Sequence, residues 1–259
     1  MKKALKKLIL ILLKINLIKL FFDRFANWYL KNLQDTSNSY EIINIRVIGT
    51  EGGKYFAKKY SNYISSKIDL TDKNFLDIGC GDLNLLSALN MVNPPKNYYA
   101  FDINIGNILH GIKFCKKEGI NINNLIYETG GNFQFKKINS NEIDFAFSHS
   151  LCCHLTINTL SILLKNLKPK MKKNSIYATS FIFDDRNDEY YNEKINIKWD
   201  LIDPFYKNKY KIESYFLRDP YHYLPNTIKK IALDNGWELL KIEEHGHELQ
   251  KVAILTPKF

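Results

Sequence analysis

A short segment, Phe75-Leu76-Asp77-Ile78-Gly79-Cys80-Gly81, combines a carboxylate with two closely spaced glycines. Its apolar residues predict a buried strand. The glycines predict a sharp turn, in which the backbone can approach a ligand closely because no Cβ intervenes. Asp77 stands near the end of that strand, where a carboxylate would repel a phosphate group. The segment therefore favours a ligand that presents a cation.

A second carboxylate ends the next predicted strand, residues 98–102. Asp102 follows Asp77 by 25 residues. At this spacing a carboxylate can accept hydrogen bonds from both ribose hydroxyls of an adenosine cofactor. The sulfonium and ammonium groups of S-adenosylmethionine (SAM) would supply the cation. The two segments resemble the first and second motifs of the class I SAM-dependent methyltransferases, matched here by residues 77–81 and by Asp102.

The sequence departs from the family pattern at Leu83, where a third glycine is common. A Rossmann-type dehydrogenase is the alternative, and its G-x-G-x-x-G pattern requires Gly or Ala at position 84, where this chain has Asn. The resemblance implies an α/β, Rossmann-like fold with a seven-stranded, mostly parallel sheet and helices on both faces. It covers about residues 45–259 and is most specific over 75–155.

The resemblance also implies which residues hold the cofactor. Asn132 would pair with the adenine edge and Phe133 would pack beside the ring, although an ordinary turn also accounts for residues 130–133. Gly52 and Gly53 are further candidates, for which a plain turn before a helix is the simpler explanation. The expected SAM contacts are Asp77, Gly79, Gly81, Asp102, Ile103, Asn132, Phe133 and Ser148.

The fourth predicted strand, residues 143–148, runs into His149-Ser150-Leu151-Cys152-Cys153-His154-Leu155 and resembles the fourth motif of small-molecule methyltransferases. Ligands of open α/β sheets sit at the carboxyl ends of strands. We therefore expect Ser148, His149 and Ser150 to lie near the transferred methyl group.

A hydroxyl acceptor must lose its proton during methyl transfer, so a general base assists, and histidine titrates in the right range. His149 and His222 are the expected catalytic residues. His154 matches a family position that is more often structural. His110, His245 and His247 have no motif around them and are expected to be surface or structural residues.

An insertion at about residues 184–223 is dense in aromatic side chains, which suit the lining or cover of a pocket. We interpret it as a lid and expect substrate contacts from Ser150, Tyr190, Tyr221 and Tyr223. A subsidiary hydrophobic cluster under a long loop is the alternative. No cluster of residues resembles a metal site, so we expect a metal-independent reaction.

The remaining pattern predicts helices at about 105–118, 157–167 and 224–235. Further strands are predicted at 125–127 and 175–183, and a closing antiparallel pair at 237–242 and 251–255. A length of 259 residues predicts one domain with additions. Its four cysteines show neither zinc spacing nor a disulfide framework, which favours a cytoplasmic location.

Charge is concentrated at the N-terminus. Residues 1–34 carry eight basic side chains and one acid, which is +7 of the total +10. Because the body is nearly neutral, nucleic acid is not expected as a substrate. We expect residues 1–44 to form a basic amphipathic helical segment, and no apolar run in it is long enough to span a bilayer. Either peripheral contact with the inner face of the membrane or packing on the body or on a subunit accounts for residues 1–34.

The pattern resembles methyltransferases of bacterial surface-polysaccharide (capsule) pathways. That resemblance implies SAM-dependent O-methylation of a small polar acceptor, such as a sugar, a nucleotide sugar or a phospho or phosphoramidate intermediate. Two alternatives remain: methylation of a lipid-linked or quinone-like acceptor at the membrane surface, and a non-catalytic scaffold with the methyltransferase fold.

Overall fold

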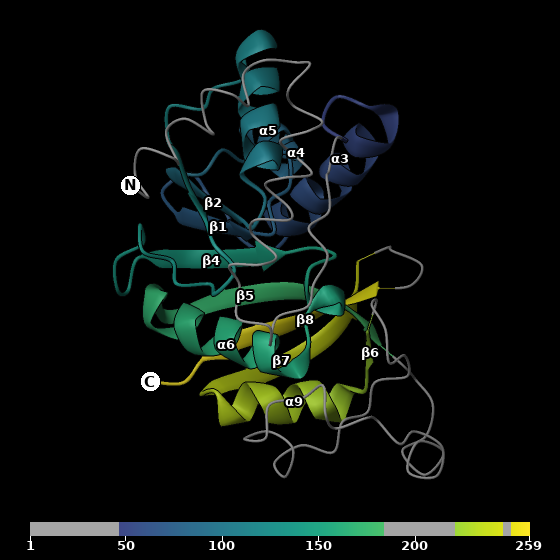
Figure 1. Ribbon diagram of the computed structural model, residues 1–259, viewed down its shortest axis with the longest axis vertical. Coiled ribbons are helices and arrows are strands. Elements are labelled where there is room, and N and C mark those ends of the chain that lie inside the picture. The colour runs from purple at the N-terminus through teal and green to yellow at the C-terminus, as the bar shows by residue number, and fades with distance from the viewer. Residues whose placement is uncertain (1–46, 184–220, 246–249) are drawn as a thin grey trace, which may run out of the picture.

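The computed structural model describes residues 47–183, 221–245 and 250–259 (Figure 1). The described helices are α3 (Glu51–Ser65), α4 (Asn84–Val92), α5 (Ile105–Lys117), α6 (Ile157–Leu167) and α9 (Pro225–Asp234), with 3-10 turns η1 (Cys152–His154) and η2 (Lys168–Lys170). The strands are β1 (Asn74–Ile78), β2 (Asn97–Asp102), β3 (Leu125–Thr129), β4 (Ile143–Ser148), β5 (Met171–Phe183), β6 (His222–Tyr223), β7 (Trp237–Glu244) and β8 (Gln250–Pro257).

The strands form one mixed sheet in the order β3-β2-β1-β4-β5-β8-β7. Strands β1 to β5 pair in parallel, whereas β8 is antiparallel to both β5 and β7. The two-residue strand β6 pairs with β5 outside this path, which makes eight strands. The seven strands of the main path confirm the expected sheet. The additional strand β6 is too short to leave a periodic pattern in the sequence.

Helices cover both faces of the sheet, as predicted: α3, α4 and α5 lie on one side, and α6 and α9 on the other (Figure 1). Alternate strand residues divide between two cores. Phe75 stacks between Tyr98 and Phe145 in the core beneath α3 to α5. Leu76 and Tyr99, the next residues along their strands, belong to the core beneath α6 and α9. The sheet is thus a rigid, doubly covered platform.

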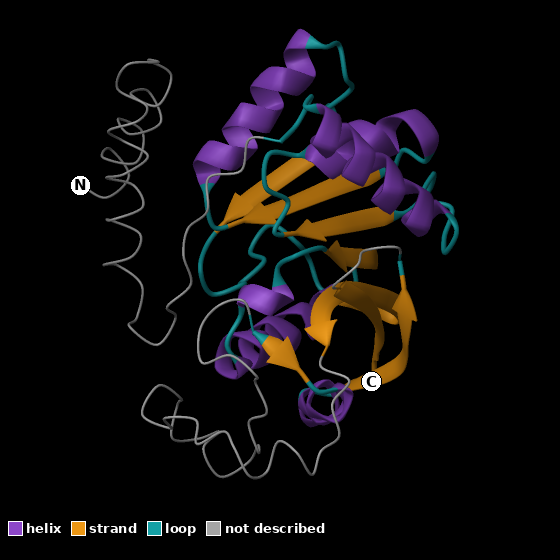
Figure 2. Cartoon of the chain, turned by 90° about the vertical axis from the view of Figure 1, so that its right-hand side faces the viewer, coloured by secondary structure: helices purple, strands orange, loops and turns teal. Residues whose placement is uncertain are grey.

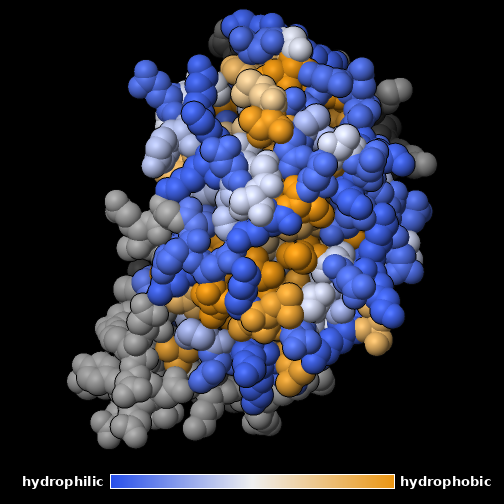
Figure 3. Space-filling model, turned by 180° about the vertical axis from the view of Figure 1, so that it is seen from behind, coloured by the Kyte–Doolittle hydropathy of each residue, from blue (hydrophilic) through white to orange (hydrophobic). Residues whose placement is uncertain are grey.

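Parallel strands bring their carboxyl ends to the same edge, so the arrowheads of the parallel strands lie on one side of the molecule (Figure 2). Seen from behind the view of Figure 1, the surface shows a band of apolar residues between hydrophilic ones (Figure 3). The carboxyl edge is where β1, β2 and β4 end in the residues that the sequence singles out.

Several predictions fall on residues outside the described ranges: the N-terminal segment, Tyr190, His247 and most of the aromatic insertion. Within residues 47–183, 221–245 and 250–259, none of the helices has both the length and the hydropathy that a membrane span needs.

Candidate functional site

The glycine turn after β1 folds over the end of β2. Gly79 and Gly81 have φ values of +77° and +53°, a region that favours glycine. The amides of Gly79 and Cys80 donate to the Phe101 carbonyl at 2.7 and 3.1 Å. The Gly81 amide donates to Asp102 Oδ2 at 2.9 Å. The turn and the two acidic strand ends therefore form one hydrogen-bonded unit.

The residue at the position of the missing third glycine keeps a glycine-like backbone. Leu83 has φ +63° and is fully buried as the N-cap of α4. Space for it comes from Gly111 of α5, where a Cβ would lie 2.9 Å from Leu83 Cβ and 2.0 Å from the Asp82 carbonyl oxygen. A glycine on a neighbouring helix thus lets a side chain occupy this turn.

Asp77 lies beneath the turn and is only 4% exposed. The Tyr98 hydroxyl donates to its Oδ2 at 2.5 Å. Burial raises the pKa of Asp77 to about 7, helped by the nearby charge of Asp102 and opposed by the Tyr98 hydrogen bond. A carboxylate held in this way is ready to be neutralised by a cationic ligand.

Asp102 ends β2 and is 7% exposed. Besides the Gly81 amide on Oδ2, the Asn104 amide donates to its Oδ1 at 2.7 Å. Burial raises the pKa of Asp102 to about 6 against the effect of these two hydrogen bonds. Each carboxylate oxygen keeps a second lone pair, so the group can still accept hydroxyl donors. Ile103, the next residue, is partly exposed beside it.

Asp82, which the sequence analysis did not single out, anchors the segment before α3. Its Oδ2 accepts the amides of Val47 at 2.6 Å and Ile48 at 2.9 Å. From the start of α4, Asn84 Nδ2 donates to the Gly53 carbonyl at 2.8 Å. Gly52 and Gly53 lie inside α3. The expectation that they form a plain turn before the helix is therefore wrong.

β4 exits beside the glycine turn, since Leu151 side-chain atoms lie 3.3 Å from the place a Gly79 Cβ would take. Ser148 is fully buried, and its hydroxyl hydrogen-bonds with Thr179 at 2.7 Å and with the Tyr177 hydroxyl at 2.8 Å. Its side chain is thus engaged inside the protein, and the residues at the edge are His149 and Ser150.

His149 meets two residues that lie far from it in the sequence. The Tyr60 ring of α3 has its centroid 3.9 Å from that of His149, and the His245 ring lies 5.6 Å from both. His245 is 7% exposed and Tyr60 6% exposed. Burial raises the pKa of the Tyr60 phenol well above its usual value. His245 is therefore an interior neighbour of a predicted catalytic residue, which no local motif indicated.

An ion pair fixes α3 against β7 so that these rings meet. Glu243 accepts the Tyr63 hydroxyl and lies 2.7 Å from both Lys67 Nζ and Lys241 Nζ. Burial opposes the charge of Glu243, but hydrogen bonds from Lys241, Lys67 and Tyr63 hold its pKa at about 2. The carboxylate is ionised at neutral pH and ties the helix to the strand.

β6 brings the second predicted base to the same edge. His222 is partly exposed and pairs with Ile182 of β5. The Tyr221 amide donates to the Cys153 carbonyl at 2.6 Å, which joins β6 to the turn after β4. Tyr223 is 1% exposed and its hydroxyl donates to the Leu155 carbonyl at 2.5 Å. Of the predicted substrate contacts, Tyr223 thus lies in the core, whereas Tyr221 and Ser150 are partly exposed.

The predicted adenine contacts lie in the link between β3 and β4. Phe133 is buried against Phe101 and Phe135, and its φ is +48°. Asn132 is exposed, and its carbonyl accepts from Asn166. His154 is partly exposed at the end of η1, and His110 Nδ1 lies 3.7 Å from Asp82 Oδ2.

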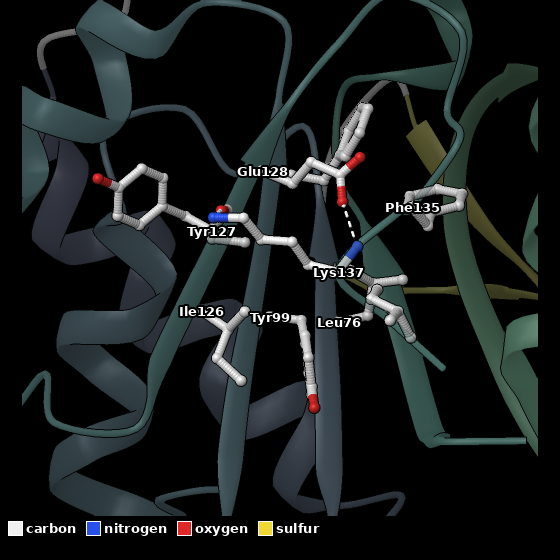
Figure 4. Close-up of a pocket in the computed structure, with 10 residues that line it drawn as sticks. Leu76, Tyr99, Ile126, Tyr127, Glu128, Phe135 and Lys137 are labelled. Carbon is white, nitrogen blue, oxygen red and sulfur yellow. Dashed lines mark hydrogen bonds between the residues drawn. The ribbon is translucent and has the colours of Figure 1, made fainter. Parts of the chain in front are cut away.

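A small pocket opens under the same link, on the face of the sheet that carries Leu76 and Tyr99 (Figure 4). Its charged groups are already engaged. The Glu128 carboxylate accepts the amides of Lys136 and Lys137 at 2.9 and 2.8 Å, and Lys137 Nζ donates to the Tyr127 carbonyl at 2.7 Å. The charged side chains that line the pocket are therefore not free to bind a ligand. Among the residues that the structure describes, no three His, Cys, Asp or Glu side chains gather where they could hold a metal ion.

No protein-family model and no curated protein matches this sequence. Solved structures match it in fold. A SAM-dependent methyltransferase from Aquifex aeolicus is 15% identical with a TM-score of 0.55, over 89% of this chain and 98% of that one. Magnesium protoporphyrin IX methyltransferase from Synechocystis PCC 6803, solved with S-adenosylhomocysteine (SAH), is 13% identical with a TM-score of 0.55, over 94% and 99%.

The mitomycin 7-O-methyltransferase is 10% identical with a TM-score of 0.58, and the match spans 80% of this chain but only 54% of that enzyme. These identities are too low to transfer a substrate or a residue role. Strand order, the antiparallel β8 and the paired helical layers nevertheless agree with the expectation from the motifs. The chain has the Rossmann-like fold of the class I SAM-dependent methyltransferases.

Proposed function

We propose that this protein is a SAM-dependent methyltransferase. The observation that carries the proposal is the unit formed by Asp77, Asp102 and the turn from Gly79 to Gly81. A buried carboxylate whose nearest charged neighbour is another carboxylate costs stability, so its presence is typical of a functional site. A scaffold would gain nothing from this pair of acids.

The residues present fit SAM in charge and shape. Asp77 and Asp102 offer negative charge at the carboxyl ends of adjacent strands. Gly79 and Gly81 leave the backbone open to close approach, because neither has a Cβ and both have positive φ. We assign Asp102 to the ribose hydroxyls and Asp77 to the positive end of the cofactor, with Ile103, Asn132 and Phe133 as the further contacts. Ser148 is not among them, because it is fully buried and its hydroxyl is bound to Thr179 and Tyr177.

SAM supplies an electrophilic methyl group when bound. The chain has to align the acceptor, exclude water and take up a proton from a hydroxyl acceptor. His149 and His222 are our proposed bases, because both lie at the carboxyl edge and are partly exposed. We propose Ser150, Tyr190 and Tyr221 as substrate contacts, and the aromatic insertion that precedes β6 as a lid. Tyr223, which lies in the core, is not among these contacts.

For the acceptor we propose the oxygen of a small polar molecule, namely a sugar, a nucleotide sugar or a phospho or phosphoramidate intermediate of surface-polysaccharide (capsule) synthesis. This is supported by the resemblance of residues 148–155 to the fourth motif of small-molecule methyltransferases, and by the two histidines at the edge. Such a function would place the protein in the cytoplasm.

A lipid-linked or quinone-like acceptor is the second candidate, and the basic apolar segment at residues 1–34 favours it. The two candidates differ in one requirement. Removal of residues 1–34 should abolish methylation of an acceptor embedded in a membrane and spare methylation of a soluble one.

Calorimetric titration with SAH tests the proposal. We expect micromolar binding to the parent chain. In Asp102→Ala the affinity should fall by about 1.5–3 kcal/mol, roughly ten- to hundredfold, because the ribose hydroxyls lose a charged acceptor. His149→Ala and His222→Ala should keep the parental affinity, since their proposed roles concern the acceptor.

Asp144→Ala is the matched control. Asp144 accepts the Asn74 amide at 2.9 Å and pairs with Lys172 at 2.8 Å, near the start of β4 rather than its end. This variant should bind SAH like the parent. Absence of SAH binding by the folded parent chain would overturn the proposal and leave the non-catalytic scaffold as the better description.

A further inference from the structure

A closed ring of hydrogen bonds lies just after the end of β4. It joins Ser150, Ser180 of β5 and Gln250 of β8. The Ser150 amide donates to Ser180 Oγ at 2.8 Å, and Ser180 Oγ donates to Gln250 Oε1 at 2.6 Å. Gln250 Nε2 then donates to Ser150 Oγ at 2.7 Å. Ser180 is fully buried and Gln250 is 6% exposed.

We infer that Gln250 is a positioning residue for the His149–Ser150 segment. This inference rests on the proposed function, in which that segment faces the acceptor. Gln250 begins β8 and pairs with Ile182 of β5, so its place is fixed by the sheet. Its amide is suited to the task because it accepts from one serine and donates to the other, which no carboxylate or aliphatic side chain does.

The segment needs such support because Ser150 has φ +50°. Residues other than Gly, Asn and Asp seldom take this left-handed conformation, which persists only when the surroundings impose it. Here the ring engages both the amide and the hydroxyl of Ser150. The conformation of Ser150 places the next residue, Leu151, against Gly79 of the glycine turn.

The same hairpin also contacts His149 directly. β7 ends at Glu244, and the ring of the next residue, His245, lies 5.6 Å from the His149 ring. Tyr60 covers His149 from α3 with its ring centroid at 3.9 Å. Gln250 thus fixes the backbone of the segment, while His245 and Tyr60 confine the imidazole.

Nuclear magnetic resonance of the full chain tests the inference without an acceptor. The two signals are the amide exchange rate of Ser150 and the imidazole resonances of His149, assigned by their loss in His149→Gln. In Gln250→Leu we expect Ser150 to exchange roughly three- to tenfold faster, as for the loss of a buried hydrogen bond, and the His149 resonances to shift and broaden. Gln250→Glu should leave both signals perturbed, because its carboxylate cannot donate to Ser150 Oγ and would be a buried charge.

Thr256→Val is the matched control on the same strand, since Thr256 Oγ1 donates to the Ser175 carbonyl at 3.0 Å near the far end of β8. It should leave Ser150 and His149 unchanged. Ser180→Ala removes the acceptor of the Ser150 amide itself, so it gives the reference size of both changes when the ring opens. Gln250→Met, which keeps the length of the side chain, decides the role of Gln250 if the leucine variant does not fold.

Unchanged Ser150 exchange and His149 resonances in folded Gln250→Leu or Gln250→Met would overturn the inference. Amide exchange that becomes faster evenly along β5 and β8 would also overturn it, because it would show that Gln250 stabilises the sheet in general and does not position Ser150. SAH titration of the parent chain is read separately: its failure would reject the methyltransferase proposal, whereas the resonance data alone decide the role of Gln250.

Discussion

Asp77 is the residue at which stability and the proposed function conflict. Its pKa in the folded protein is about 7, above the ordinary 3.8. A carboxyl group with a raised pKa favours the folded state most below pH 3.8, and that contribution is lost as the pH rises through 7. The free-energy cost of holding an ionised Asp77 inside the folded protein is therefore present in full only at alkaline pH.

We predict that Asp77→Asn stabilises the protein at pH 8, by an amount on the order of 2–4 kcal/mol. The amide cannot ionise, and its oxygen still accepts from the Tyr98 hydroxyl. The gain should shrink as the pH falls from 8 to 5, and SAH binding should weaken. Thermal unfolding at several pH values checks this. A loss of stability at pH 8 would show that the Asp77 charge is compensated in the folded protein.

For single residues, the sequence predicted that Asp77 and Asp102 lie at strand ends and that Gly79 and Gly81 form a turn, because these are local patterns. Their contacts with a cofactor stay predictions. The sequence did not indicate Tyr60, His245 or Gln250. Their importance comes from contacts between residues far apart in the chain, and a lone tyrosine or glutamine has no spacing to read. Asp82 was overlooked although it adjoins the motif, because its partners are backbone amides before α3.

Among the elements, α5 packs closely against the residues that follow the glycine turn, a contact that the sequence did not indicate. A Cβ at Gly111 would lie 2.0 Å from the Asp82 carbonyl oxygen, whereas one at Gly52 of α3 would meet nothing within 4 Å. We predict that Gly111→Ala lowers stability by at least about 2 kcal/mol and weakens SAH binding. Gly52→Ala should raise stability by about 0.5–1 kcal/mol.

Thermal unfolding and SAH titration of the two variants check this pair. Equal effects of the two substitutions would show that α5 moves away from the turn at little cost. The inner strands were predictable from continuous apolar runs, because the sheet is covered on both faces, and the helices were predictable from the face that each buries. β6 was not, because two residues carry no period and its place beside β5 is decided by packing of Tyr223 against Phe181.

For the whole molecule, the uneven charge is the property that the fold does not explain. The N-terminal 34 residues carry +7 of the total +10, whereas the described part of the fold begins with the Val47 and Ile48 amides bound to Asp82. We expect the charge that precedes it to attract an anionic surface.

We predict that the full chain sediments with vesicles containing phosphatidylglycerol and not with pure phosphatidylcholine vesicles. Replacing Lys3, Lys7 and Lys14 by Gln should weaken binding roughly hundredfold, since each lysine near an anionic surface contributes about 1 kcal/mol. The same change at three exposed lysines of α5, residues 113, 116 and 117, removes equal charge from the body and should have little effect. Equal losses in the two triple variants would indicate non-specific attraction. Unchanged vesicle binding with altered self-association would instead assign the segment to a contact between subunits.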